Sequence, residues 1–243
     1  MKLITLNTWG GRVHQPLLDF FRANADADIF CLQEIYHQAP REKIWKEITD
    51  DTFNLFSDIQ GALPDHQGYF RPHLEDYYGL AIFAKKDIRV DREGDVSIYE
   101  VKDYAGGGNH PRNLQHLHFA KDGKNFTIAN VHGLWNGKGK TDTADRLEQS
   151  RKIKEFIKTS SSAATILCGD FNLMPDTESV RALEDGMRNL VAEHSVQSTR
   201  TSLYAKPDKF ADYIFVSPEI EVKNFAVLPD EVSDHAALFL EFK

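Results

Sequence analysis

The stretch TILCGDFNLMPD, Thr165 to Asp176, joins a strand-like beginning to a polar end. Its first four residues are typical of a buried strand, and they lead into a glycine, an acid, an aromatic residue and an amide. Side chains two positions apart share one face of a strand, so we expect Asp170 and Asn172 to point one way and Phe171 the other. Unpaired polar groups are costly in a buried place, so this strand end predicts a functional site.

The composition predicts one globular domain over residues 1–243. A hydrophobic content of 41% and an aromatic content of 11% argue against disorder. The formal net charge of −8 argues against a protein that coats nucleic acid non-specifically, although acids gathered around a metal ion would explain part of that charge. No apolar run approaches the roughly 20 residues that a membrane-spanning helix needs.

The first residues and the two cysteines bear on location. The chain begins with the strand-like MKLITLNTWG, without the segments of a secretory signal. Cys31 and Cys168 lie inside apolar runs, which predicts buried free thiols and a cytoplasmic location.

Strand-like and helical segments alternate along the chain. The Asp122–Gly123 pair predicts a hairpin between two strands, and the helix after Thr141 is expected to begin with Thr141 or Asp142 as its cap and to bury Ala144. This mixture of hairpins and helical crossovers predicts an α/β protein with sheets inside and helices outside. The pattern predicts helices over 14–26, 41–58, 142–159 and 176–186, and strands over 2–9, 28–34, 78–86, 113–122, 124–133, 165–172, 211–217, 221–228 and 236–242.

Nine polar residues, four of them acids, lie at or just past the ends of the predicted strands. Each alone has a structural explanation: Asn7 could close a turn, Glu34 could begin a helix, and Asp234 could cap one. Their repeated occurrence at strand ends favours a shared site instead. The nine are Asn7, Glu34, Asn130, His132, Asp170, Asn172, Asp212, Asp234 and His235.

The motifs LNTWG, LQE, NVHG, GDFN, ADYIFVS and SDH occur in this order between Asn7 and His235. Together they resemble the endonuclease/exonuclease/phosphatase superfamily, which includes DNases, AP endonucleases, deadenylases, inositol polyphosphate phosphatases and neutral sphingomyelinases. The resemblance implies a four-layered α/β/β/α sandwich with two mixed, mainly antiparallel sheets face to face.

The resemblance also implies a metal site for Mg²⁺, with Mn²⁺ as an alternative ion. Glu34 corresponds to the principal carboxylate ligand, and Asn7 and Asp234 correspond to direct or water-mediated partners. Magnesium prefers oxygen ligands and keeps several waters, so one or two carboxylates with a substrate oxygen suit it.

His235 resembles the general base of the family, and Asp212 would accept a hydrogen bond from its other ring nitrogen. Asp170 and Asn172 would surround the phosphate and position the nucleophile. His132 corresponds to a residue that stabilises the phosphate or assists the leaving group, and Asn130 would orient its neighbours.

Further residues are candidates for substrate binding. Arg112 resembles an arginine near the phosphate in nuclease-type members, with a solvated arginine as the alternative. Trp9 and Trp135 follow motif residues and offer either base stacking or ordinary packing. Lys138 and Lys140 belong to a basic loop that could reach a phosphate or only aid solubility.

Two other segments are candidates for lining the cleft. In YYGLAIF, Tyr78 and Gly79 could line it or only pack in the core. The glycine-rich loop 104–111 is expected to overhang it, and its glycines do not form a phosphate-binding P-loop.

The sequence therefore predicts a Mg²⁺-dependent phosphohydrolase that cleaves a phosphodiester by attack of a His-activated water. The expected partner is a phosphate-ester substrate, with nucleic acid as one candidate and no obligate protein partner. A phosphomonoesterase acting on a small molecule or lipid head group is the alternative. A catalytically dead binding protein is disfavoured because the ligand and base residues are all present.

Overall fold

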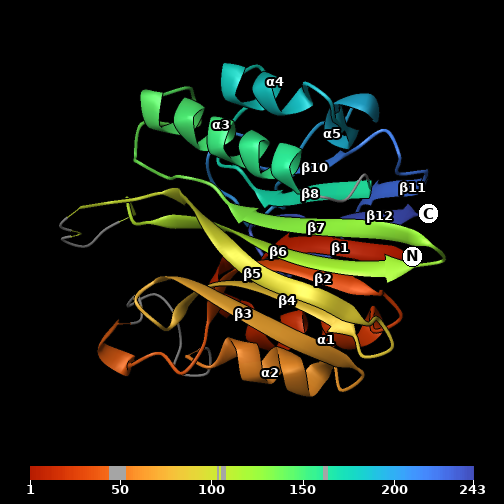
Figure 1. Ribbon diagram of the computed structural model, residues 1–243. Helices are drawn as coiled ribbons and strands as arrows, with labels where there is room; N and C mark the ends of the chain where they lie inside the picture. The colour runs from red at the N-terminus through yellow and green to blue at the C-terminus, as the bar shows by residue number, and fades with distance from the viewer. Residues whose placement is uncertain (44–52, 103, 105–107, 161–163) are drawn as a thin grey trace.

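The computed structural model describes residues 1–43, 53–102, 104, 108–160 and 164–243. Two six-stranded sheets lie face to face (Figure 1). The first sheet has the order β11 (Val222–Val227), β12 (Leu238–Phe242), β1 (Lys2–Asn7), β2 (Ile29–Tyr36), β4 (Tyr78–Lys85) and β3 (His66–Leu74). The second has the order β5 (Val90–Tyr99), β6 (Arg112–Lys121), β7 (Lys124–His132), β8 (Ala164–Asp170), β10 (Asp212–Val216) and β9 (Arg188–Asn189).

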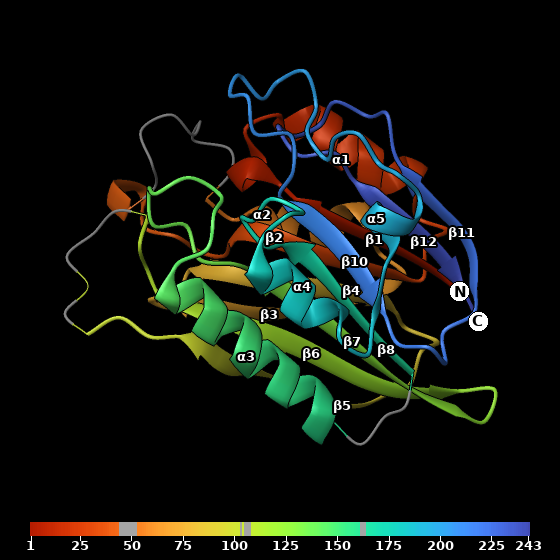
Figure 2. The same cartoon turned by 90° about the horizontal axis from the view of Figure 1, so that it is seen from above.

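Helices cover the outer faces of both sheets. Figures 1 and 2 show α3 (Ala144–Thr159) and α4 (Glu178–Glu184) on one side of the sandwich, with α1 (His14–Ala23) and α2 (Leu55–Ala62) on the other. The short α5 (Leu190–Glu193) lies near β10, and the 3₁₀ turns η1 (Trp9–Gly11) and η2 (Arg41–Lys43) complete the described elements. The predicted α/β/β/α sandwich is confirmed.

Strand direction brings the functional strand ends together. Each sheet contains one parallel pair, β1 with β2 and β7 with β8, and the other pairings are antiparallel. The carboxyl ends of a parallel pair meet at one edge, so Asn7 lies opposite Gln33, and His132 lies opposite Asp170.

Alternation along the strands separates two hydrophobic cores. Leu3 on β1 faces the other sheet and joins a core that contains residues of both sheets, whereas Ile4 and Leu6 pack with α1 and α2. Leu3, Thr5 and Asn7 share the inner face, which is why Asn7 reaches across to β8. Cys31 and Cys168 are buried free thiols in this interior, as predicted.

Several local predictions were wrong. β1 ends at Asn7, and Trp9 leaves the strand with φ of 53° in a 3₁₀ turn. β2 does not end at Glu34 but continues to Tyr36 through an irregularity between Leu32 and Ile35.

The third helix also differs from expectation, because Thr143 caps it and Ala144 is exposed. Asp142 instead accepts hydrogen bonds from the backbone nitrogens of Glu178 and Ser179, at the beginning of α4.

Other differences concern whole elements. The predicted helix over 41–58 falls partly on residues 44–52, which lie outside the described residues; its described parts are η2 and the beginning of α2. The strands β3 and β5 were not predicted. Both are outer strands of their sheets with half-exposed, polar sequences, so their apolar alternation is weak.

The length and polarity of the helices bear on whether the chain could cross a membrane. Within the described residues, none combines the length and apolarity needed to cross a bilayer.

Candidate active site

Side chains from the ends of β1, β2 and β8 meet between the two sheets. The Asn7 amide Nδ2 donates to Glu34 Oε1 and to Asp170 Oδ2, both at 3.0 Å, and thereby bridges the sheets. Asn7 Oδ1 accepts from the backbone nitrogen of Trp9, which fixes the amide orientation. His132 Nε2 lies 3.7 Å from Asp170 Oδ2 and 3.9 Å from Glu34 Oε1. Asp170 Oδ2 is therefore at the centre of this group.

The backbone is unusual where it presents these groups. Glu34 and Asn172 have φ of 59° and 54°, values that non-glycine residues rarely adopt and that cost roughly 1–3 kcal/mol each. Gly169 precedes Asp170 with φ of 131°, and a Cβ there would lie 2.1 Å from the carbonyl oxygen of Val131. Only glycine permits this approach of β8 to β7, which places Asp170 beside His132.

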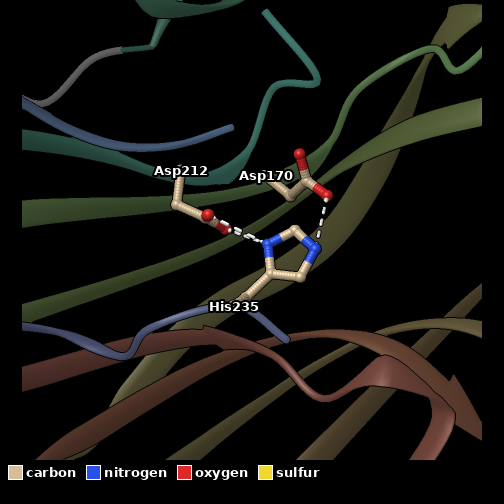
Figure 3. Close-up of side chains that lie close together, drawn as sticks. All are labelled: Asp170, Asp212 and His235. Atoms are coloured by element: carbon tan, nitrogen blue, oxygen red, sulfur yellow. Dashed lines mark hydrogen bonds and ion pairs between the residues drawn. The ribbon is translucent and has the colours of Figure 1, made fainter. Parts of the chain in front are cut away.

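His235 and Asp212 form a buried pair beside Asp170 (Figure 3). His235 Nδ1 lies 2.9 Å from both carboxylate oxygens of Asp212, and Nε2 lies 3.6 Å from Asp170 Oδ2. With Nδ1 donating to Asp212, Nε2 is left to accept a proton. Ser233 Oγ donates to the backbone oxygen of Asn7 and accepts from the backbone nitrogen of His235, so the segment is fastened to β1.

Burial sets the protonation of this pair. It lowers the pKa of His235 to about 3, with the positive charge of Arg200 as the next cause. Burial also raises the pKa of Asp212 to about 7, while Arg200 and Lys140 oppose that rise. The imidazole is therefore neutral at pH 7, the form that a general base requires.

The oxygen-rich part of the site fits a hard divalent cation. Burial, and then the charges of Asp234 and Asp170, raise the pKa of Glu34 to about 7, although the hydrogen bond from Asn7 opposes this. Asp234 Oδ1 is buried with no hydrogen-bond partner in the described part of the chain. Crowded carboxylates with an unused oxygen match the ligands that Mg²⁺ prefers.

A second group could in principle hold a metal. One ligand atom each from Asp170, Asp212 and His235 lie within 4.8 Å of one another. Both oxygens of Asp212 approach the Nδ1 atom of His235, however, and a nitrogen ligand is less suited to magnesium than oxygen. Acid–base chemistry explains this trio better than a metal cage does.

Arg112, at the beginning of β6, is only 2% exposed, so the alternative of a solvated arginine is wrong. Its Nε and Nη1 atoms are buried without hydrogen-bond partners among the described residues. Around it are the rings of His73, His110 and Tyr78, with His73 stacked on His110 at 5.1 Å. Burial and the charge of Arg112 lower the pKa of His110 to about 3, so this histidine adds no charge. Two unused donors on a permanent cation suit a phosphate.

These groups line one cavity of about 260 Å³. Of the sequence-predicted residues, Asn7 and Asp212 lie behind its wall and hold the lining residues Glu34 and His235. Tyr78 also lines it, whereas Gly79 is absent from the lining and packs against the backbone of Arg71 and Pro72. The predicted residues in the lining are Trp9, Glu34, Arg112, His132, Trp135, Lys140, Asp170, Asn172, Asp234 and His235.

Asn130 and Lys138 do not line the cavity. Asn130 is fully buried and donates to the backbone oxygens of Leu32 and Ala81, while its Oδ1 accepts from Gln33 Nε2 at 2.7 Å. It therefore ties the two sheets together underneath the site. Lys138 is exposed.

Sequence reasoning missed four cavity residues: His110, Arg200, Tyr204 and Lys206. His110 belongs to the loop that was expected to overhang the cleft, and Gly108 of that loop also lines the cavity. The other three lie on the segment before β10, where Arg200 forms an isolated β-bridge with His235. The run STRTSLYAK has no periodicity, and only its cations and tyrosine could have indicated this role.

Solved structures share the fold over the whole chain. A mannosyl-6-phosphatase from Bacteroides thetaiotaomicron is 22% identical with a TM-score of 0.76, and the match covers 100% of this chain and 99% of that one. A humanized TDP2 from D. rerio is 16% identical with a TM-score of 0.75, covering 100% and 98%. The human Nocturnin catalytic domain, with a bound sulfate anion, is 20% identical with a TM-score of 0.69, covering 100% and 93%.

No curated protein matches the sequence. The sequence profile described as Endonuclease/Exonuclease/phosphatase family, in contrast, matches residues 4–235. This match spans nearly the entire chain and includes every residue that lines the cavity, from Trp9 to His235. The chain therefore belongs to the endonuclease/exonuclease/phosphatase family.

Proposed function

We propose that this protein is a divalent-metal-dependent phosphohydrolase that cleaves a phosphate-ester P–O bond by in-line attack of water. Its family comprises hydrolases that include phosphatases and nucleases and generally depend on divalent metals. One observation carries the proposal: His235 is held by Asp212 through Nδ1 and turns Nε2 towards Asp170, in the same cavity as Glu34 and Asp234.

Glu34, oriented by Asn7, and Asp234 would hold Mg²⁺ or Mn²⁺, which when bound polarises a phosphoryl oxygen as a Lewis acid. His235 Nε2 accepts a proton from the attacking water, and Asp212 stabilises the imidazolium that forms. Asp170 orients that water, while Asn172, His132 and Arg112 stabilise the negative charge that grows on the phosphoryl oxygens. The new P–O bond forms to the water oxygen, and the bond to the leaving oxygen breaks.

Two observations favour a small substrate over duplex nucleic acid. The cavity has a volume of about 260 Å³, below the range of about 300–1,000 Å³ typical of sites for drug-sized ligands. The chain also carries a net charge of −8, which opposes binding to a long polyanion. A small phosphodiester is the first substrate class.

A phosphomonoester is the second, because the unused donors of Arg112 match the additional charge of a monoester dianion. The same proposal treats residues 1–243 as one domain, which the pairing of β1 with β12 supports. The two buried thiols support a reducing, cytoplasmic location.

The test is a hydrolysis assay with Mg²⁺, Mn²⁺ or EDTA. The substrates are bis-p-nitrophenyl phosphate, p-nitrophenyl phosphate, a dinucleotide, single-stranded DNA and RNA, and sugar phosphates. We expect metal-dependent turnover that disappears in His235→Ala and persists in His194→Ala, a matched control because His194 is exposed. Turnover that survives EDTA, or that His235→Ala retains, would contradict the proposal.

A further inference from the structure

One wall of the cavity combines three cations with two aromatic rings. The Arg200 guanidinium lies 4.0 Å from the ring centre of Tyr204, and Lys140 Nζ lies 5.2 Å from the same centre. Lys206 Nζ lies 5.5 Å from the ring centre of Trp135. All five residues line the cavity that contains His235 and Glu34, so we call them the cationic wall.

Two of these cations are buried without full pairing. Lys140 is 3% exposed, and its Nζ donates to the backbone oxygen of Phe210 at 2.8 Å, with no carboxylate partner within 4.0 Å among the described residues. Burial lowers the pKa of Lys140 to about 8. The Arg200 side chain is 6% exposed; Nη1 donates to Asp234 Oδ2 at 3.0 Å, but Nε is buried without a hydrogen-bond partner in the described chain. Buried cations are normally paired, so an anion is expected to complete this wall.

The charge of the cavity lining also favours an anionic ligand. Its lining contains three acids, Glu34, Asp170 and Asp234, and four cations, Arg112, Lys140, Arg200 and Lys206. The lining is therefore net positive in a chain whose overall charge is −8. Asp170 and Asp234 lie beside His235, whereas three of the four cations belong to the cationic wall, where Arg200 also pairs with Asp234.

The rings of the wall are partly occupied by their own cations. Arg200 and Lys140 approach the ring of Tyr204, and Lys206 approaches that of Trp135. Trp135 is also close to Gly108, where a Cβ would lie 3.0 Å from Trp135 Cδ1. These contacts between cations and rings help to hold the three cations in place along the cavity.

We propose that Lys140, Arg200 and Lys206 form a subsite for a second phosphoryl group of the substrate, beside the group that is hydrolysed. This inference rests on the proposed function and narrows the substrate class to small phosphate esters with two phosphoryl groups. Such a group comes either from a bisphosphorylated small molecule or from the neighbouring phosphate of a short oligonucleotide.

The test compares matched substrates with and without the second phosphate. One pair is fructose 1,6-bisphosphate and fructose 6-phosphate; the other is a thymidine dinucleotide with and without a 5′-phosphate. Lys206→Ala is the main variant because Lys206 is exposed, so its loss should spare the fold, and exposed Lys209 in the same segment provides the control Lys209→Ala. Lys140→Met is the second variant, used after a thermal melt shows that it is folded.

In the pair that is hydrolysed, we expect KM for the doubly phosphorylated compound to be about tenfold lower than KM for the singly phosphorylated one. A charge-assisted hydrogen bond to the second phosphate accounts for a difference of this size. Lys206→Ala should remove most of this preference with little change in kcat, Lys140→Met should also remove the preference, and Lys209→Ala should keep it. The pair that shows the preference identifies the source of the second phosphate. Equal KM values within both pairs, or equal losses in Lys206→Ala and Lys209→Ala, would overturn the subsite.

Binding separates this inference from the proposed function. The His235→Ala variant, titrated calorimetrically with the same four compounds in Mg²⁺, reports recognition without turnover. Preferential binding of doubly phosphorylated compounds, lost on adding Lys206→Ala, supports the subsite even where the wild type hydrolyses nothing. Hydrolysis without any such preference would reject the subsite and leave the proposed function standing.

Discussion

The Asn130 side chain and the polar side chains of the cavity are both buried in the sandwich. They differ in how completely their polar atoms are hydrogen-bonded within the chain. Beneath the cavity, every polar atom of the Asn130 side chain has a partner: Nδ2 donates to Leu32 O, Ala81 O and Gln115 Oε1, and Oδ1 accepts from Gln33. In the cavity, Arg112, Arg200 and Asp234 each keep at least one buried polar atom without a hydrogen-bond partner among the described residues.

The difference agrees with a structural role for Asn130 and a ligand-binding role for the cavity residues. A buried polar group that is satisfied within the chain stabilises one arrangement of the two sheets, whereas an unsatisfied one costs free energy of folding. A bound ligand that supplies the missing hydrogen bonds would offset this cost. In the sequence, Asn130 and several cavity residues look alike, as polar residues at strand positions that face inward. Only their hydrogen-bond partners in the structure distinguish a structural role from a functional one.

The largest expected effect is at the catalytic side of this comparison. His235→Ala should lower kcat by about 10³-fold, because a general base contributes roughly 10²–10⁴-fold. Single-turnover kinetics at saturating substrate measure the chemical step, and calorimetric Mn²⁺ titration should show metal binding largely kept. Unchanged single-turnover rates would place His235 outside the chemistry.

Asn130→Leu tests the structural side. It removes the acceptor for Gln33 and the donor to two carbonyl oxygens, so the free energy of unfolding should fall by about 3 kcal/mol. Denaturant titration measures this loss, and turnover per folded molecule should stay near that of the wild type. A stable variant with greatly reduced turnover would move Asn130 into the catalytic group.

Asp212→Asn makes a smaller change within the catalytic group. The amide can donate to His235 Nδ1 and thereby favour the tautomer with a proton on Nε2, so kcat should fall by about 10²-fold. The pH–rate profile should shift as well, because the carboxylate no longer stabilises the imidazolium. An unchanged profile and a normal kcat would separate Asp212 from the function of His235.

The smallest effect concerns His118, whose Nδ1 lies 2.8 Å from Thr127 Oγ1. Burial, and then the charge of Arg92, lower the pKa of His118 to about 4. In the unfolded chain, the His118 imidazole binds a proton below about pH 6.5, whereas in the folded chain it does so only below about pH 4. The free energy of unfolding should therefore fall as the pH drops through this range.

The free energy of unfolding of the wild type and of His118→Gln, measured at pH 7.5 and 4.5, tests this sign. The wild type should lose about 1–2 kcal/mol more than the variant on acidification. The exposed His194→Gln serves as control. Equal losses in the wild type and in His118→Gln would show that His118 does not contribute to the pH dependence of stability.

The sequence allowed prediction where one local rule controls the structure. The Asp122–Gly123 turn joins β6 and β7 as expected, with φ of 51° and 76°, because few residues tolerate two positive φ values in succession. The inward side of Asn7 followed from alternation along β1. Asn7, His132 and Asp170 could be named as candidates because each ends a strand.

Other features depend on distant parts of the chain. The bend at Glu34 could not be read from LQEIY, because the irregularity arises from pairing with β4, and Trp9 turns away from β1 within η1. The cationic wall joins the segment after Trp135 to the one before β10, which no periodicity connects. Asn130 was placed on the correct face of β7, but its partners on the other sheet set its role.

The pairing of β1 with β12 has a consequence for refolding. Lys2 lies opposite Glu241, so the central part of the first sheet closes only when residues more than two hundred positions apart meet. Long-range pairings form late, because the entropy of closing a large loop is lost before the contacts repay it. Asp234 and His235 lie directly before β12, whereas the β6–β7 hairpin needs only local contacts. Catalytic activity should therefore return last after dilution from denaturant. The rate at which turnover recovers then measures the rate of the final folding step.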